Sequence, residues 1–407
     1  MKRNKGISLI VLVITIIVMV ILAGAIILTL NNSGIINKAG EAVKATNEAT
    51  VKEVASLGWA EAYADGARTE EELKAGVVSA LEKNNIEPED YGMVVTTSGV
   101  TIKKGWLKDG FTLVKGDKVL GIGDSIAYDE TAGGTKTVAT NVDWKVLGAD
   151  EQGNLLIMSA GDVKTGFRLG YESTMTTAEA KLVESIKDME TGVSQLNAEC
   201  LPYGYGEGVV GQARCITAED VNSVTGYNPE TASNGNPYRY GELGQYGNKV
   251  TYSYNGTTKP AYSSVVKSGT LTTTHSNGFY YYNGEKVVHI NDLTTGTNGN
   301  VFATLTSDYY YYYAPDLTTI IATDNAKAYS MIFGNDDTYY WLASPCVYTW
   351  ADIAYFGMRH VYSGYVGSYG LFYSDGSSYY NEHGVRAVVT LSSDITLTGD
   401  SRNGWSY

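Results

Sequence analysis

Tyrosine is the residue type with the clearest capacity for chemistry in this chain. The 407 residues include 33 Tyr, against 7 Phe and 6 Trp. A buried tyrosine hydroxyl needs a hydrogen-bond partner, so a chain that needed only aromatic core would use more phenylalanine. Tyrosine in excess indicates surfaces that are both apolar and hydrogen-bonding, which suit binding. The alternative is that tyrosine simply suits exposed β-strands.

One stretch, residues 346–386, combines many tyrosines with Ser, Asp, Gly, Asn and His at positions that alternate with apolar residues. Tyrosine offers rigid contact area at low entropic cost and the small polar residues adapt, which is the chemistry of a paratope. The alternative is a polar β-surface without a ligand. The predicted ligand-binding residues are Tyr348, Trp350, Asp352, Tyr355, His360, Tyr362, Tyr365, Tyr369, Tyr373, Asp375, Tyr379, Tyr380, Asn381 and His383.

A serine nucleophile is the main enzymatic candidate. The segment 123–126, GDSI, resembles the nucleophile block of one lipase-like hydrolase family, which also needs a downstream Asp-x-x-His. None of the four histidines has Asp three residues before it. Because a serine nucleophile needs its base, the sequence predicts no enzyme and a structural turn at Asp124, with a surface hydrolase as a disfavoured alternative.

Metal and redox chemistry find little support. The three cysteines, Cys200, Cys215 and Cys346, form no CxxC pair, which argues against a zinc site or a redox dithiol. Cys200 and Cys215 are either a disulfide or two buried thiols. The acidic run 335–337 is interpreted as a turn or helix cap and not as a calcium site. No cofactor and no metal are predicted.

Acidic residues outnumber basic ones by 44 to 30, giving a net charge of −14. Such a chain repels phosphate, so nucleic acid is excluded as a partner.

A basic leader, MKRNKG, precedes an uncharged apolar run over residues 7–30. At about 1.5 Å per residue, a helix of this length crosses a bilayer core of about 30 Å. The basic leader then stays in the cytoplasm, which predicts a single-pass protein of the cell membrane and surface with its bulk extracellular. The alternatives are a signal peptide cut near Ala23–Ala25 and a plain signal anchor.

The segment from Lys5 to Ile10 resembles the cleavage site of type IV prepilins. The resemblance implies that prepilin peptidase cuts between Gly6 and Ile7 and methylates Ile7, and that other pilins are partners. Pilins usually carry Glu at the fifth mature position, where this chain has Val11. The resemblance therefore implies a minor or tip pilin, or a membrane-anchored relative, in place of a major subunit.

The segments 340–344, YWLAS, and 384–388, GVRAV, resemble the ending of a C-type-lectin-like fold. This version is shared by formylglycine-generating-enzyme relatives and by the variable proteins of diversity-generating retroelements. The resemblance implies a compact α+β unit over residues 140–395 with framework residues Trp341, Leu342, Val385 and Val388 and an exposed ligand face.

Local sequence patterns predict the remaining helices and strands. Helical periodicity is predicted over 36–57, Thr69–Lys83, 177–189 and 217–223, and β-structure over 93–97, 100–103 and a hairpin at 144–158. The expected fold class is α+β: a long N-terminal transmembrane and stalk helix, then a lectin-like domain with many short strands. The expected divisions are 1–6 leader, 7–64 anchor and stalk, 65–135 small pilin-like region and 136–407 ligand-binding domain.

Together these features predict a cell-surface, pilin-like protein that binds a protein or glycan ligand. The alternative is a structural pilin subunit with no specific ligand.

Overall fold

The computed structural model describes residues 35–130, 142–170, 191–226, 250–254, 257–261, 266–267, 280–282, 285–290, 300–305, 308–309, 325–334, 338–350, 353–362, 364–373 and 380–407. The chain divides into two compact units, Met1–Lys104 and Gly105–Tyr407. The sequence placed this boundary near residue 135. The difference arises because Trp106, Leu113 and Leu120 are buried in the core of the second unit.

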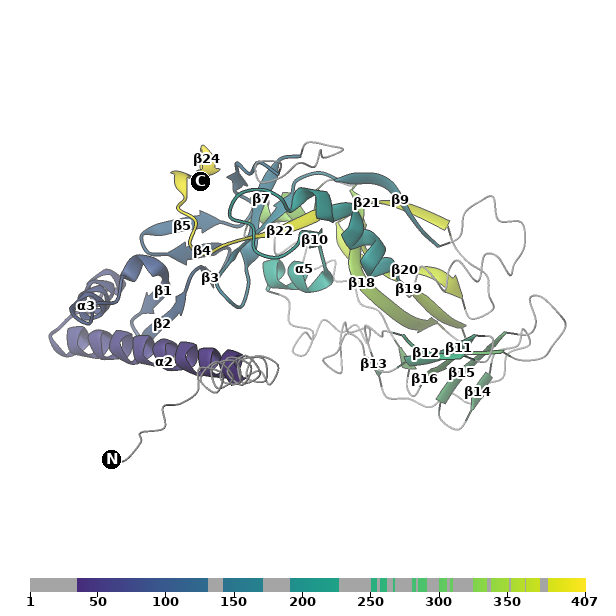
Figure 1. The fold of residues 1–407 in the computed structure, drawn as a ribbon, viewed down its shortest axis with the longest axis horizontal. Helices are drawn as coiled ribbons and strands as arrows, with labels where there is room; N and C mark the ends of the chain where they lie inside the picture. The colour runs from purple at the N-terminus through teal and green to yellow at the C-terminus, as the bar shows by residue number, and fades with distance from the viewer. Residues whose placement is uncertain are drawn as a thin grey trace, which may run out of the picture. The chain divides into compact units, whose positions relative to one another are not determined.

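The first unit pairs two helices with a β-hairpin (Figure 1). Helix α2 spans Ile35–Ala64 and α3 spans Glu70–Lys83, and a short 3-10 turn, η1 (Pro88–Asp90), leads into the antiparallel strands β1 (Tyr91–Thr96) and β2 (Gly99–Lys104). These confirm the helices and strands predicted between residues 36 and 104. Thr69 caps α3 in a reciprocal capping box with Glu72, which satisfies backbone donors at the helix start.

Helices α2 and α3 approach each other closely at two glycines. A Cβ added to Gly58 would lie 2.5 Å from the Cβ of Ala80, and one added to Gly76 would lie 2.4 Å from the Cβ of Ala62. Each helix thus presents a glycine and an alanine four residues apart to the other. Small residues at these positions set the short distance between the helix backbones.

The predicted membrane helix and single-pass location are contradicted. Within the part of the chain that the structure describes, no helix has the length and apolar composition needed to cross a bilayer. The long helix that it does contain, α2, carries Lys and Glu along its length, including Lys38, Glu41, Lys44, Glu48 and Lys52, and such charges are costly in hydrocarbon. The run 7–30 lies outside the described residues.

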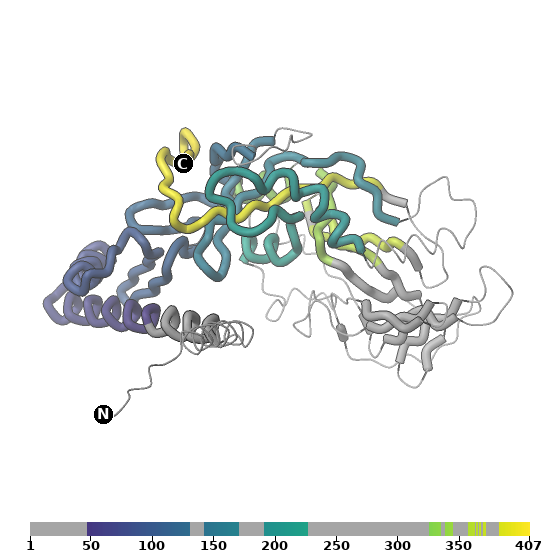
Figure 2. Tube along the Cα trace, viewed as in Figure 1, coloured from purple at the N-terminus to yellow at the C-terminus, as the bar shows by residue number. Residues whose placement is uncertain are grey.

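The second unit is built mainly from antiparallel sheets. A seven-stranded sheet has the order β10-β22-β8-β7-β6-β24-β23, and its strands are β10 (Arg214–Cys215), β22 (Ala387–Leu391), β8 (Leu155–Ser159), β7 (Trp144–Ala149), β6 (Ser125–Ile126), β24 (Gly404–Ser406) and β23 (Thr398–Asp400). The hairpin predicted at 144–158 is confirmed by β7 and β8. In Figure 2 the yellow C-terminal segment runs between segments from much earlier in the chain, which matches the insertion of β22 beside β8.

A five-stranded sheet carries most of the predicted ligand-binding residues. Its order is β20-β19-β18-β21-β9, and its strands are β20 (Tyr365–Tyr373), β19 (Ile353–Tyr362), β18 (Tyr339–Trp350), β21 (Tyr380–Val385) and β9 (Lys164–Gly170). A three-stranded meander is formed by β3 (Leu107–Asp109), β4 (Thr112–Lys115) and β5 (Lys118–Gly121).

Two further sheets have the orders β12-β11-β16-β15-β14 and β13-β17. Their strands are β11 (Val250–Tyr254), β12 (Thr257–Ala261), β13 (Val266–Lys267), β14 (Tyr280–Tyr282), β15 (Glu285–Ile290), β16 (Asn300–Leu305) and β17 (Asp308–Tyr309).

Short helices cover the sheets of the second unit. They are η2 (Leu201–Tyr203), α5 (Ala218–Thr225), α7 (Ala326–Phe333) and a helix over residues 191–200. Helix α5 confirms the prediction at 217–223, whereas the helix predicted at 177–189 lies outside the described residues. One buried cluster, which includes Trp144, Ile157, Trp341 and Val388, runs through the unit.

The α+β fold class is also corrected, because the second unit is mostly β-sheet. The sequence predicts many short strands in the lectin-like domain. Residues 339–350 and 353–362 instead form two long strands, with 12 residues in β18 and 10 in β19. Tyr, Val, Ile and Phe favour extended backbone, and pairing with neighbouring strands extends the ladder through the intervening glycines.

Candidate ligand-binding site

Strands β18, β19 and β20 bring the tyrosines of residues 346–386 into register. At one end of the three strands, Tyr348 pairs with Tyr355, and Tyr355 pairs in turn with Tyr373. We call these three positions the tyrosine row. Directly paired positions of antiparallel strands belong to one face of a sheet. The register therefore assembles residues that are separated by up to 25 positions in the chain.

A second set of tyrosines is paired at the opposite end of the same strands. Tyr339 pairs with Tyr362, and Tyr362 pairs with Tyr365. The rings of Tyr339 and Tyr362 meet edge to face with their centroids 4.7 Å apart. Both side chains are half-buried, so these tyrosines contribute to packing as well as to the surface.

The two histidines predicted to face a ligand are buried. His360 of β19 and His383 of β21 are each 6% exposed, and His360 Nδ1 lies 2.9 Å from His383 Nε2 in a hydrogen bond. The strands that carry them flank β18, and the ring of Trp341 lies 4.4 Å from that of His383. The structure therefore places this pair in the packing behind the surface.

Burial sets the charge state of the histidine pair. Desolvation lowers the pKa of His383 to about 4, against an opposing backbone hydrogen bond with Glu382. Desolvation first, and then the charges of His383 and Arg359, lower the pKa of His360 well below its usual value. Both rings are therefore neutral at pH 7, and one donates while the other accepts.

The structure leaves part of the predicted site undescribed. The backbones of Tyr348, Trp350, Tyr355, Tyr365, Tyr373, Tyr380 and Asn381 lie in described strands, but nothing is described of their side chains. Asp352, Asp375 and Tyr379 lie outside the described residues, as do the processing site Gly6–Ile7 and the acidic run 335–337. Tyr369 is half-buried beside the histidine pair, 5.7 Å from His360 between ring centroids.

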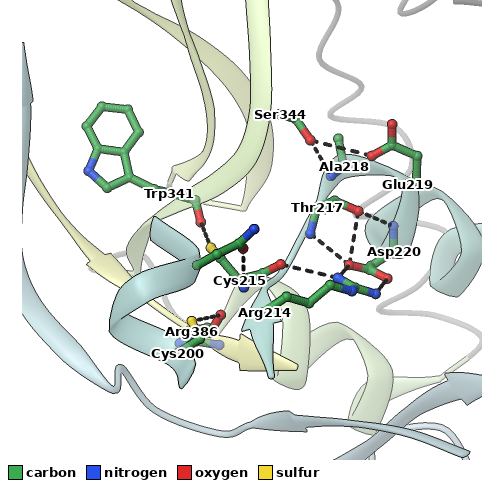
Figure 3. A network of polar contacts seen from close by, with 11 residues as sticks. Cys200, Arg214, Cys215, Thr217, Ala218, Glu219, Asp220, Trp341, Ser344 and Arg386 are labelled. Atoms are coloured by element: carbon green, nitrogen blue, oxygen red, sulfur yellow. Dashed lines mark hydrogen bonds and ion pairs between the residues drawn. The ribbon is translucent and has the colours of Figure 1, made fainter. Parts of the chain in front are cut away.

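A polar network anchors β18 to helix α5 (Figure 3). The buried hydroxyl of Ser344 accepts a 2.9 Å hydrogen bond from the backbone N–H of Ala218, at the first turn of the helix. Arg214 forms a two-pronged pair with Asp220 at 2.6 and 2.7 Å. The Ser344 contact fixes β18 four residues before Tyr348, and the Arg214–Asp220 pair holds α5 to β10.

The segment 384–388 forms a second anchor. The guanidinium of Arg386 lies 4.4 Å from the ring centre of Tyr340 and donates a 2.8 Å hydrogen bond to the carbonyl of Met331 in α7. Gly384 is required here, since a Cβ would lie 2.0 Å from a carboxylate oxygen of Asp162. The framework residues Trp341, Leu342, Val385 and Val388 are all buried.

Cys200 and Cys215 are buried free thiols, which settles the choice that the sequence left open. The Cys215 thiol donates to the carbonyl of Trp341 at 3.6 Å, as Figure 3 shows. A hydrogen bond with Cys215 and burial raise the pKa of the Cys200 thiol well above its usual value, so this thiol is unreactive.

Ser125, the candidate nucleophile, lies in a turn whose polar side chains form hydrogen bonds within the fold. Asp124 is 1% exposed, and its carboxylate accepts hydrogen bonds from Lys327, from Trp405 Nε1 at 3.1 Å and from the Gly121 N–H at 2.9 Å. The Ser125 hydroxyl accepts from Lys145 at 2.7 Å. The turn thus fastens the C-terminal strand β24 and helix α7 to the sheet, as the sequence predicted for Asp124.

One hollow of about 360 Å³ was not anticipated. It is lined by Ala127, Tyr128, Asp129, Glu207, Ser406 and Tyr407. These residues come from segments up to 280 positions apart, so local patterns held no signal for the hollow.

Among the residues that the structure describes, no group of three or more His, Cys, Asp or Glu side chains is arranged to hold a metal ion. Comparison of the chain with known protein families, with curated proteins and with solved structures gives no match.

Proposed function

We propose that this protein acts by non-covalent binding, without catalysis, and that strands β18–β21 recognise a protein or glycan ligand. The observation that carries the proposal is the tyrosine row, in which Tyr348, Tyr355 and Tyr373 occupy directly paired positions on three neighbouring strands. Neighbouring tyrosines on one face give contact area and hydroxyl groups together, with little side-chain entropy to lose on binding.

The packing behind the strands supports the same proposal. Met358, His360 and Leu371 are buried, and Ser344 and Arg386 tie the sheet to helices α5 and α7. A rigid scaffold of this kind lowers the entropic cost of ordering a binding surface. The hydrogen bonds of Asp124 and Ser125 within the fold favour a structural role for the GDSI segment.

The test is a triple variant of the full chain, Tyr348→Ala, Tyr355→Ala and Tyr373→Ala. Wild-type and variant chains are applied to an array of printed glycans and to an array of immobilised proteins. We expect the wild type to bind a restricted set of spots on one array. Loss of buried aromatic anchors weakens binding by about 2 kcal/mol each at a hot spot, so the variant should bind at least about 100-fold more weakly.

Tyr205→Ala is the matched control, because Tyr205 is 36% exposed and lies outside the tyrosine row. It should keep wild-type binding, and the unfolding midpoints of all chains should be compared to exclude loss of folding. Absence of selective binding on both arrays would refute a binding function. Equal binding by the triple variant would show that the site lies elsewhere.

A further inference from the structure

The five-stranded sheet is joined weakly at its centre. Nine residue pairs connect β18 to β19, whereas β18 and β21 share the single parallel pair Tyr340↔Gly384. On the far side, β21 is paired along its length with β9. The sheet is therefore two ladders, β18–β20 and β21–β9, with a short backbone connection between them.

Side chains supplement this connection. The His360–His383 hydrogen bond crosses over β18 from β19 to β21. The indole N–H of Trp341 in β18 donates a 2.9 Å hydrogen bond to the carbonyl of Phe167 in β9. The rings of Trp341 and Tyr369 lie 4.4 and 5.9 Å from that of His383. We call His360, His383, Trp341 and Tyr369 the join cluster.

Protonation of both rings is incompatible with the hydrogen bond in this cluster. The bond needs one protonated and one unprotonated ring nitrogen, so a doubly protonated pair would place two N–H donors face to face at 2.9 Å. A single added proton would place a charge among buried aromatic rings. Strands that separate expose both imidazoles to water, where each binds a proton with a pKa of about 6.5.

Charged neighbours do not favour the protonated pair. Arg359 of β19 is fully buried, and its charge lowers the pKa of His360. Glu382 of β21 directs its carboxylate to Arg168 of β9, with 2.5 Å between the atoms.

The remaining titratable groups near the pair are carried by several elements. They are the phenols of Tyr339 on β18, Tyr362 on β19 and Tyr369 on β20, whose rings lie beside the two imidazoles.

We propose that the His360–His383 pair is an acid-sensitive latch, which holds the β18–β20 ladder to the β21–β9 ladder at neutral pH and releases it on acidification. The consequence for ligand binding rests on the proposed function: release frees the β18–β20 ladder, which carries the tyrosine row, from its fixed place in the sheet, so bound ligand is lost on acidification.

The size of the effect follows from linkage. If separation of the two ladders exposes one histidine to water, the equilibrium constant for separation rises roughly 20-fold between pH 7 and pH 5. If it exposes both histidines, this constant rises roughly 500-fold. Hydrogen exchange of the full chain, corrected for the intrinsic pH dependence of exchange, measures this constant without a ligand. We expect the protection of β18–β21 against exchange to fall roughly 20- to 500-fold from pH 7 to pH 5. The protection of β7 and β8, in the same unit, should change by no more than a few-fold.

The double variant His360→Asn and His383→Gln removes both titrating rings. The Asn amide replaces Nδ1 and the Gln amide replaces Nε2, so the hydrogen bond is retained without a proton-binding group. Its β18–β21 protection should be independent of pH, whereas the control His289→Gln should behave as the wild type. The latch would be overturned if, in the wild type, acid lowered the protection of β18–β21 no more than that of β7 and β8. It would also be overturned if acid lowered the protection of β18–β21 equally in the wild type and in the double variant.

The array experiment repeated at pH 5 separates this inference from the function. Selective binding at pH 7 that is lost at pH 5, and kept by the double variant, supports both. Absence of binding at either pH refutes the binding function while the exchange result still decides on the latch. If the double variant does not fold, the comparison of strands within the wild type remains decisive.

Discussion

The two compact units differ in the kind of core that stabilises each of them. The buried residues described in the first unit form an apolar cluster of Val51, Ala55, Leu73, Val77, Leu81, Met93, Val95 and Ile102. The second unit also buries charged and titratable groups, including Asp124, Arg359, His360, His383 and Arg386. An apolar core contributes the same stability at every pH, whereas buried titratable groups link stability to protonation. The comparison therefore assigns acid sensitivity to the second unit.

The largest expected effect is truncation of Trp341 to alanine. Its side chain is fully buried and donates to the Phe167 carbonyl, so the change should destabilise the second unit by about 4 kcal/mol. Hydrogen exchange read separately for each unit measures this loss. Leu81→Ala is the counterpart in the first unit, where roughly 3 kcal/mol should be lost. A Trp341 variant with unchanged protection in β18 and β9 would contradict the packing described here.

Acidification should produce the next largest effect, and in the second unit alone. Because the pKa of folded His383 is about 4 and its unfolded value is 6.5, the unfolded chain binds more protons as pH falls. The stabilisation is present in full above about pH 6.5 and is lost as pH falls toward 4, by about 3 kcal/mol for this histidine. Denaturant unfolding at a series of pH values tests this, and His383→Gln should flatten the curve.

Gly58→Ala tests the close helix pair of the first unit. The new Cβ would meet the Cβ of Ala80 at 2.5 Å, and overpacking of this kind costs about 2 kcal/mol in spite of the better helix propensity of alanine. Gly161→Ala is the control, since nothing lies within 4 Å of a Cβ at that position. Equal unfolding midpoints for the two variants would mean that α2 and α3 are farther apart than described.

Removal of the α3 cap is the smallest of these effects. Thr69→Ala deletes the side chain that accepts from the Glu72 N–H and should cost about 1 kcal/mol. Thr69→Asn keeps a cap-competent oxygen and should restore most of the loss. Circular dichroism during denaturant unfolding measures the stability of both variants. Equal stability of the alanine and asparagine variants would exclude a role for the cap.

Local sequence determined much of the first unit and part of the second. The capping box at Thr69 and Glu72, the β-runs around residue 100 and the hairpin at 144–158 are set by contacts between residues close in the chain. Such signals depend on neighbours a few positions away, so a single sequence reveals them. The prepilin-like processing and the partners that it implies stay predictions.

Only the tertiary structure decided which tyrosines and histidines lie together. His360 and His383 are 23 residues apart, and Asp124 and Trp405 are 281 apart. Alternation along 346–386 predicts a surface rich in tyrosine. It does not predict the irregular register between Trp341 and Pro345, which sets the residues of β18 and β19 that are paired. A shift of one residue in register moves a side chain to the other face of a sheet, so the face of a residue depends on how its strand is paired. The sequence pattern alone assigned both histidines to the surface, whereas pairing between distant strands buries them.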